Sequence, residues 1–264
     1  MNGKVLQKLF NVYALLKGKP EIVLIPLVFI LVVIVWEVAA AAYGIEIIFP
    51  KLSRVVQSFV MAIEQGVVWK NMWMTLYESI AGFVLGALCG VIIGTIISQL
   101  PLAEKVIYPY IVIFQSMPKV ALAPLFVIWF GFGITSKIVM AVIISFFPIL
   151  VNTIVGLRSI DQQKLDLLRS LSATKWQTFR LVKLPNALPF IMAGFEIGIV
   201  MSLLGAIVGE FIGAAKGGLG HIILQYNNNL DTAAVFWVII LLSLIGLALN
   251  LGMVMIHRKF VFWK

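Results

Sequence analysis

Long uninterrupted runs of apolar residues dominate this chain. At about 20 residues for each membrane crossing, the runs predict six transmembrane helices, at residues 22–43, 72–98, 107–131, 135–157, 186–212 and 232–256. The fold class that follows is an all-α polytopic membrane protein. We expect a short N-terminal segment, residues 1–21, followed by one transmembrane domain, residues 22–264.

Residues 50–65, PKLSRVVQSFVMAIEQ, alternate apolar and polar positions at helical spacing. The segment is too polar to span a membrane, and we expect a helix that lies flat at the interface. Pro50, its first residue, comes just before the expected helix, where a helix can start.

A second amphipathic segment lies in the middle of the chain, in the loop 158–185. Its core, residues 166–185, reads DLLRSLSATKWQTFRLVKLP. Residues 166–171 can make about two helical turns, with Leu165, Leu168 and Leu171 on one side. Thr174 can cap a second helix that begins at residue 175 or 176.

Composition and charge set the orientation. Hydrophobic residues make up 62% of the chain and charged residues only 12%, whereas about a quarter of a soluble domain is charged. Most of the 20 lysines and arginines fall on the side that holds both chain ends and the loop 158–185. That side is predicted to be cytoplasmic. The net charge of +9 therefore reflects topology, and no nucleic-acid partner is expected.

The N-terminal stretch also permits another interpretation. Four lysines in the first twenty residues, an apolar stretch at 22–36 and VAAAA at 38–42 resemble a cleavable signal peptide with a small-residue cleavage site. Cleavage would leave five spans and would place the ends of the mature chain on opposite sides of the membrane.

Residues with catalytic chemistry are few. The three aspartates all fall in loops, and His221 and His257 fall on opposite sides of the predicted membrane, so no metal or general-base site can converge. A single cysteine, Cys89, provides no disulfide framework or zinc site. The chain has no G-x-x-x-x-G-K-[ST] phosphate loop and cannot hydrolyse nucleotide alone. We therefore expect no catalytic residue, no metal and no bound cofactor.

The central loop resembles the EAA loop of ABC-importer permeases, whose pattern is E-A-A, three residues, G, about nine residues, I, one residue, L-P. The matching positions are, in order, Asp166, Leu167, Leu168, Ser172, Val182, Leu184 and Pro185. Segments at 118–137, 146–161, 187–199 and 217–220 resemble the nitrate, sulfonate and taurine importer permeases. The resemblance runs from about residue 50 to the C-terminus in one consistent order.

This loop departs from the family pattern in two ways. Ser172 replaces the glycine, and Leu167 and Leu168 replace the alanines. A glycine would allow a left-handed turn at little cost, so serine must either adopt that conformation with strain or make a different turn. If the loop still docks, its bulkier leucine face must meet a matching groove.

The resemblance implies a type I, MetI-like permease fold in a bacterial inner membrane, with both termini cytoplasmic. It implies a second permease copy, identical or related, two cytoplasmic ATPase subunits that carry ATP and magnesium, and a periplasmic or lipid-anchored substrate-binding protein. The implied substrate is a small anion or organic nutrient of the nitrate, sulfonate or taurine kind, with pyrimidine or aromatic nutrients as alternatives. The residues implied in coupling to the ATPase are Leu165, Asp166, Leu167, Leu168, Arg169, Leu171, Ser172, Lys175 and Trp176.

Polar residues inside spans predict the translocation pathway, because they are costly in lipid. The third span is the most informative, since it places polar side chains around Pro118, and irregular backbone is tolerated only within protein or beside water. Lys119 either faces the pathway and favours anions or forms a structural ion pair with Glu78 or Glu196. The candidate pathway residues are Glu78, Gln115, Ser116, Lys119, Asn152, Glu196 and Glu210.

Glycines at positions 82, 86, 90 and 94 predict a close helix contact, within one subunit or at a homodimer seam. The main functional alternative is a secondary transporter or channel that works without ATP. That class predicts an internal repeat and no separate coupling loop; we find no convincing repeat. A membrane scaffold without a transport role would leave the prolines and Lys119 of the third span unexplained.

Overall fold

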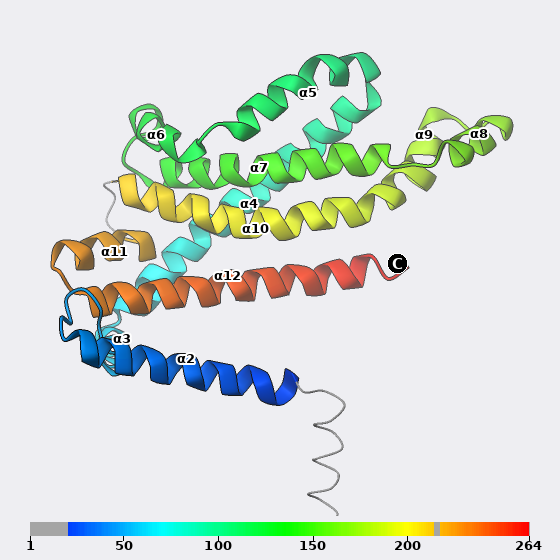
Figure 1. Ribbon diagram of the computed structural model, residues 1–264. Helices are drawn as coiled ribbons and strands as arrows, with labels where there is room; N and C mark the ends of the chain where they lie inside the picture. The colour runs from blue at the N-terminus through cyan, green and yellow to red at the C-terminus, as the bar shows by residue number, and fades with distance from the viewer. Residues whose placement is uncertain (1–20, 214–216, 264) are drawn as a thin grey trace, which may run out of the picture.

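The computed structural model describes residues 21–213 and 217–263, which form a bundle of helices joined by short connections (Figure 1). Residues 1–20, most of the predicted N-terminal segment, lie outside the described residues. The elements are α2 (Glu21–Tyr43), α3 (Leu52–Glu64), α4 (Val67–Gln99), α5 (Pro101–Ser116), η1 (Lys119–Leu122), α6 (Ala123–Phe130), α7 (Ile134–Arg158), α8 (Gln162–Ser170), α9 (Lys175–Thr178), η2 (Phe179–Lys183), α10 (Leu184–Ile212), α11 (Leu219–Asn228) and α12 (Thr232–Phe260).

Five of the six predicted spans form continuous helices that are long and apolar enough to cross a membrane: α2, α4, α7, α10 and α12. The third predicted span, 107–131, is not one straight helix. Its two halves, Lys105–Ser116 and Lys119–Phe130, meet at 84°. The sixth span exists only if this bent pair is counted as one crossing.

Pro118 explains the bend in the third span. A proline has no backbone N–H and disfavours the helical conformation of the residue before it. Met117 accordingly adopts an extended backbone, with φ −68° and ψ 138°. The helix therefore ends at Ser116 and restarts as a 3₁₀ turn at Lys119.

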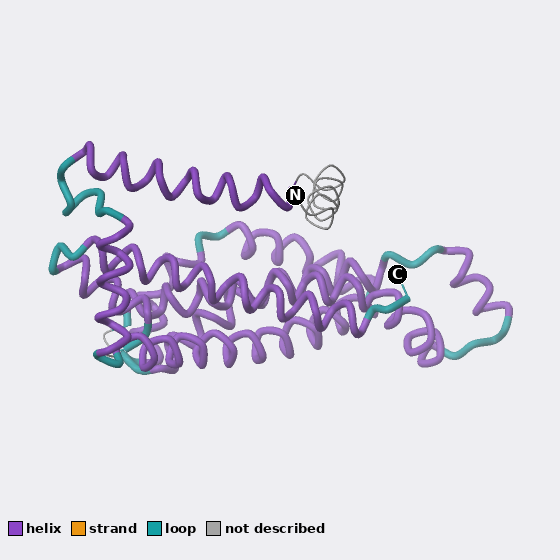
Figure 2. Tube along the Cα trace, turned by 90° about the horizontal axis from the view of Figure 1, so that it is seen from below, coloured by secondary structure: helices purple, strands orange, loops and turns teal. Residues whose placement is uncertain are grey.

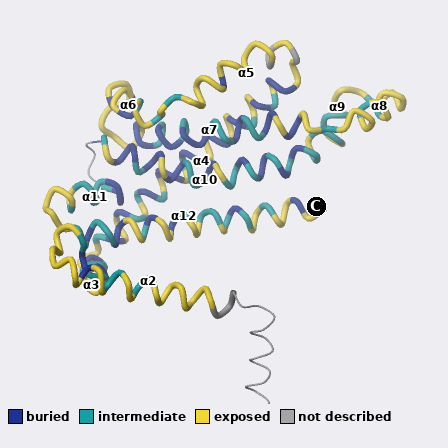
Figure 3. The backbone as a smooth tube through the Cα atoms, viewed as in Figure 1, coloured by how far each residue is buried: buried dark blue, intermediate teal, exposed yellow. Residues whose placement is uncertain are grey.

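Helices α4, α7 and α10 form the core of the bundle, and Figure 3 shows buried positions running along all three. The glycines of α4 face α7. A Cβ atom on Gly82 would lie 2.2 Å from Ala141 Cβ, and one on Gly86 would lie 2.4 Å from Ser145 Oγ. The glycine pattern therefore serves close packing within this chain, which was the first of its two predicted roles.

Helix α2 stands away from this core, as Figure 2 shows beside the N-terminal label. It is attached mainly at its C-terminal end, where Trp36 stacks on Phe49 and meets the ring of Phe236 edge-on. Helix α3 matches the amphipathic segment predicted at 50–65. Its buried face, with Val55 and Ala62, joins the apolar cluster on α12.

The two ends of the bundle differ. Helices α3 and α11 gather at one end, here called the α11 end, whereas α8 and α9 project beyond the opposite end, here called the α8 end (Figure 1). Helix α12 finishes toward the α8 end. Any membrane orientation thus places the central loop and the C-terminus on the same side.

Gly82→Ala tests the α4–α7 contact. Its new methyl group would overlap Ala141, which is fully buried, and we expect a loss of about 1–3 kcal/mol of stability, as for other overpacked cores. The measurement is the thermal unfolding midpoint of the purified chain in lipid nanodiscs. Gly252→Ala on α12 is the control, because its Cβ would meet nothing within 4 Å. Equal midpoints for the two variants would contradict the close contact.

Candidate coupling and pathway sites

The loop between α7 and α10 folds as two short helices. Asp161 caps α8 by accepting a hydrogen bond from the backbone N–H of Gln163 at 3.0 Å. Thr174 caps α9 as predicted: its Oγ1 accepts from the N–H of Gln177 at 3.2 Å, and the Gln177 side chain accepts from the Thr174 N–H at 2.8 Å. This reciprocal pair is a capping box. It begins a helix that continues through the single π turn η2 into α10.

Ser172 reaches the left-handed conformation, with φ 53°. Of the two alternatives for a serine at the glycine position, a strained left-handed turn or a different turn, the structure therefore shows the first. The turn lets the Ala173 N–H donate to the carbonyl of Leu168 at 2.9 Å and closes the end of α8. A left-handed conformation costs an ordinary residue about 1–2 kcal/mol, so the serine strains this turn where a glycine would not.

The tip of this loop exposes large apolar side chains. The exposed fractions are 61% for Leu167, 69% for Leu171 and 66% for Trp176. Leu165 and Leu168 are half-buried, so the three leucines expected on one side are not equally available. Asp166 and Arg169 form an exposed ion pair at 2.9 Å, and Lys175 is also exposed.

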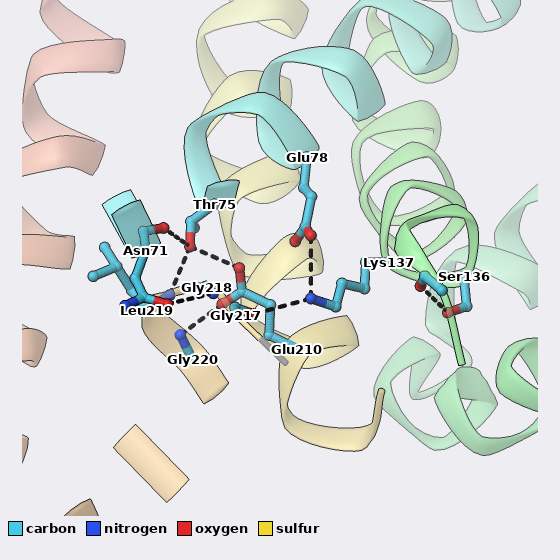
Figure 4. A network of polar contacts seen from close by, with 11 residues as sticks. Asn71, Thr75, Glu78, Ser136, Lys137, Glu210, Gly217, Gly218, Leu219 and Gly220 are labelled. Atoms are coloured by element: carbon cyan, nitrogen blue, oxygen red, sulfur yellow. Dashed lines mark hydrogen bonds and ion pairs between the residues drawn. The ribbon is translucent and has the colours of Figure 1, made fainter. Parts of the chain in front are cut away.

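A second site lies inside the bundle near the α11 end, where five polar side chains meet (Figure 4). This buried polar cluster consists of Asn71, Thr75, Glu78, Lys137 and Glu210, from α4, α7 and α10. Lys137 Nζ lies 3.2 Å from Glu78 Oε1, and both side chains are 0% exposed. Lys137 also donates to the carbonyl of Gly217 at 3.0 Å.

The two carboxyl groups of the buried polar cluster have different partners. Lys137 balances Glu78, while Glu210 accepts hydrogen bonds from Thr75 Oγ1 and from the N–H of Gly220, both at 2.6 Å. Gly220 lies in the first turn of α11, where the N–H groups and the helix dipole favour an anion. Two carboxylates can therefore sit beside one lysine without contact with water.

The buried polar cluster also fixes the start of α11. The N–H of Gly218 donates to Asn71 Oδ1 at 2.9 Å, and that of Leu219 donates to Thr75 Oγ1 at 2.8 Å. Gly217 and Gly218 have φ values of 122° and 100°, which only glycine adopts readily. Residues 217–220, GGLG, are thus the segment through which α11 is bound to the bundle.

The other candidate pathway residues lie apart from this cluster. Lys119 pairs with neither carboxylate proposed for it: its Nζ donates to the carbonyl of Gln115 at 2.8 Å and lies 5.1 Å from the ring centre of Phe147. Glu78 is paired with Lys137 instead. Glu196 Oε1 lies 2.5 Å from His257 Nδ1, so the suggested Glu196–Lys119 pair is wrong.

Two further candidates differ in their surroundings. Ser116, at the end of α5, is exposed beside the break in the third span, as is Gln115. Asn152 donates to the carbonyl of Pro148 at 2.8 Å. A Cβ on Gly194 of α10 would lie 3.0 Å from Asn152 Cβ, so Asn152 takes part in the α7–α10 contact.

Three members of the buried polar cluster were missed by sequence reasoning: Asn71, Thr75 and Lys137. Lys137 stands near the start of a predicted span, where a lysine is typical of a loop or a span end. A signal was present nonetheless, because Glu78 and Glu210 inside spans each require a buried partner. Nothing in the local pattern identified which cation would provide it.

An apolar helical bundle with a broken span and a projecting amphipathic loop is the architecture expected of a membrane transport subunit. Residues 82–262 match the family described as "Binding-protein-dependent transport system inner membrane component", and the chain belongs to this family. The resemblance stated from the central loop is thereby confirmed. The chain is a permease subunit of an ABC importer of the inner membrane and not an enzyme; its family works with substrate-binding and ATPase partners.

Curated relatives align over most of the chain. The riboflavin transport system permease protein RibX of Chloroflexus aurantiacus is 36% identical and covers 91% of this chain and 90% of its own. The formylaminopyrimidine transport permease protein ThiX of Halalkalibacterium halodurans is 33% identical, over 84% of this chain and 88% of its own. The putative aliphatic sulfonates transport permease protein SsuC of Escherichia coli is 31% identical, covering 88% and 89%.

Solved structures share the fold. An inward-facing MetNI methionine ABC transporter matches with a TM-score of 0.60 and 24% identity, over 76% of this chain and 97% of that one. An amino acid ABC transporter crystallised with histidines gives a TM-score of 0.61 and 19% identity, over 78% and 98%. The predicted type I, MetI-like permease fold is confirmed.

Lys137→Met tests the buried ion pair. The substitution removes the cation beside the buried Glu78 carboxyl group, and we expect a loss of about 3–5 kcal/mol of stability. Adding Glu78→Leu should recover much of it, because an apolar pair often replaces a buried ion pair at little cost. Thermal unfolding in nanodiscs measures both effects. Arg169→Met, in an exposed pair, should change stability by less than about 1 kcal/mol; a Lys137→Met effect as small would contradict the role of this pair.

Proposed function

We propose that two copies of this chain form the translocation pathway of an importer for a small organic nutrient. In this proposal the α8 end is cytoplasmic and binds one ATPase subunit per copy, while ATP and magnesium are held by those subunits. The α11 end faces the side from which a periplasmic or lipid-anchored binding protein delivers substrate. Both termini are then cytoplasmic.

The observation that carries the coupling role is the exposed apolar tip of the α8–α9 loop. Helices α8 and α9 project beyond the bundle (Figure 1), and Leu167, Leu171 and Trp176 of this loop are largely exposed. A soluble loop does not normally present several large apolar side chains together. A groove on a partner would cover them, with Asp166, Arg169 and Lys175 at the rim.

The pathway role rests on the broken span. At Met117 and Pro118 the backbone leaves its helical hydrogen bonds, and the adjoining Ser116 is exposed. Backbone of this kind is not stable against lipid. A second copy could pack on the α5–α6 face, with a water-filled pathway between the copies. Water in that pathway would supply hydrogen-bond partners for the freed backbone and a polar environment for Lys119.

The names of the relatives support a substrate class. Those transport riboflavin, formylaminopyrimidine, aliphatic sulfonates and taurine by their names. We infer a small polar nutrient of this range, heteroaromatic or sulfonated. Lys119 near the break, positive and held over the ring of Phe147, suits a substrate that carries an anionic group.

Leu171→Asp tests coupling. A charge at the centre of an apolar docking site should weaken ATPase binding by about 2 kcal/mol or more, which is about 30-fold in affinity. The measurement is co-purification with an ABC-importer ATPase that associates with the unaltered chain, together with ATP hydrolysis of the complex in nanodiscs. Leu167→Asp should act in the same way.

The matched control for this experiment is Ile48→Asp. The exposed fraction of Ile48 is 59%, similar to the 61% of Leu167, but Ile48 lies at the α11 end. Full ATPase binding by Leu171→Asp, or equal losses for Leu171→Asp and Ile48→Asp, would exclude the α8–α9 loop as the coupling site.

Ser116→Cys tests the pathway, in a Cys89→Ser background because Cys89 is exposed. A thiol reacts as the thiolate, which an apolar environment suppresses. We therefore expect a charged methanethiosulfonate reagent to label Ser116→Cys at least about tenfold faster than Ser243→Cys. Both serines are exposed and donate to a carbonyl four residues earlier at 2.9 Å, but Ser243 lies on α12. Equal rates would mean that Ser116 faces lipid.

A further inference from the structure

A polar pocket lies at the α11 end, between the start of α4 and α11. Its volume is about 690 Å³, within the range of about 300–1,000 Å³ typical of small-ligand sites. Its polar lining residues are Gln65, Lys70, Asn71, His221, Gln225 and Tyr226. Neither the break in the third span nor the α8–α9 loop contributes to it.

The charged side chain that lines this pocket is positive. Lys70 lines it, and no aspartate or glutamate of the described chain does. The other polar pocket at the α11 end is different, since Glu46, Arg54 and Asp231 line it together and compensate one another. A lysine in a concave site that no described carboxylate lines attracts an anion and focuses its field there.

Donors in this pocket are free to bind a ligand. Within the described part of the chain, the side chains of Gln65, Lys70, His221 and Gln225 make no hydrogen bond or ion pair. Burial, together with the charge of Asp231, raises the pKa of Tyr226, so its hydroxyl stays protonated. Lysine, imidazole and amide N–H groups together can surround a sulfonate or carboxylate.

The inner wall of the pocket is continuous with the buried polar cluster. Asn71 is only 7% exposed, and it lines the pocket while accepting the N–H of Gly218. Gly217 lines the pocket and accepts from Lys137. A ligand here would touch two of the residues that fix the start of α11.

We propose that this pocket is a binding site for a small organic anion, with Lys70 and His221 on the anionic group and the glutamines on the polar remainder. It deepens the proposed function and rests on it in one respect, the assignment of the α11 end to the side of substrate delivery. The pocket is then the first site that a delivered substrate meets on the permease. The chemical class is a sulfonate or carboxylate of roughly the size of a substituted ring.

The test uses the purified chain in nanodiscs, without ATPase or binding protein, and measures saturable binding of benzenesulfonate by ligand-observed NMR. Benzenesulfonamide, of equal size but neutral, should bind at least about tenfold more weakly, because charge-assisted hydrogen bonds are lost. Lys70→Gln and His221→Gln should each weaken benzenesulfonate binding about tenfold. Lys51→Gln changes the net charge equally at the same end, outside the pocket, and should leave binding unchanged.

Several results would overturn the proposal. These are absence of saturable binding, equal binding of the sulfonamide, or equal affinities for Lys70→Gln and Lys51→Gln. Lys70 is exposed and Lys51 is half-buried, and thermal unfolding midpoints of the variants verify that each is folded. Because no ATPase takes part in this test, absence of anion binding would not affect the coupling and pathway proposals. Conversely, if those proposals failed, a measured anion site would still stand.

Discussion

The ion pair between Lys137 and Glu78 is the interaction on which the arrangement of the bundle depends. Two charges with no exposure to water are stable only if their partners are placed accurately. The helices must therefore meet closely at this depth, and Gly209 permits it: a Cβ there would lie 2.7 Å from Lys137 Cα. The same lysine holds the carbonyl of Gly217. One buried cation thus contacts both the helix core and the segment that begins α11.

The bundle shows how far local pattern determines this fold. Apolar runs predicted six spans, and five of them are continuous helices, because burial in lipid needs only length and hydropathy. The Thr174 cap was predictable because capping is decided within four residues. The partner of Glu78 was not, since Lys137 lies 59 positions further along the chain and only tertiary packing selects it. Helix α11 was missed as well, because a short helix after GGLG carries no span-length apolar run.

The third span shows both a feature that local sequence indicates and one that it does not. Its prolines and polar residues were visible in the sequence and indicated irregular backbone, but hydropathy alone predicted a straight crossing. The 84° bend arises because Pro118 removes a donor and holds Met117 extended. Lys119 then turns to the nearest acceptor, the carbonyl of Gln115, rather than to a distant carboxylate. A local break in the backbone thereby decided a side-chain partner that the sequence left open between two glutamates.

The two ends of the bundle are connected through a single element. Residues Lys175–Ile212 form one continuous helical segment of 38 residues, which begins at the cap of α9 and carries Glu210 near its far end. Glu210 in turn accepts the N–H of Gly220 at the start of α11. A rigid helix transmits displacement along its axis. The irregular positions in this one are Pro189 inside α10 and the π turn η2, a feature that often marks functional positions. A push on the α8–α9 loop would therefore reach the contact that holds α11 and its adjoining pocket.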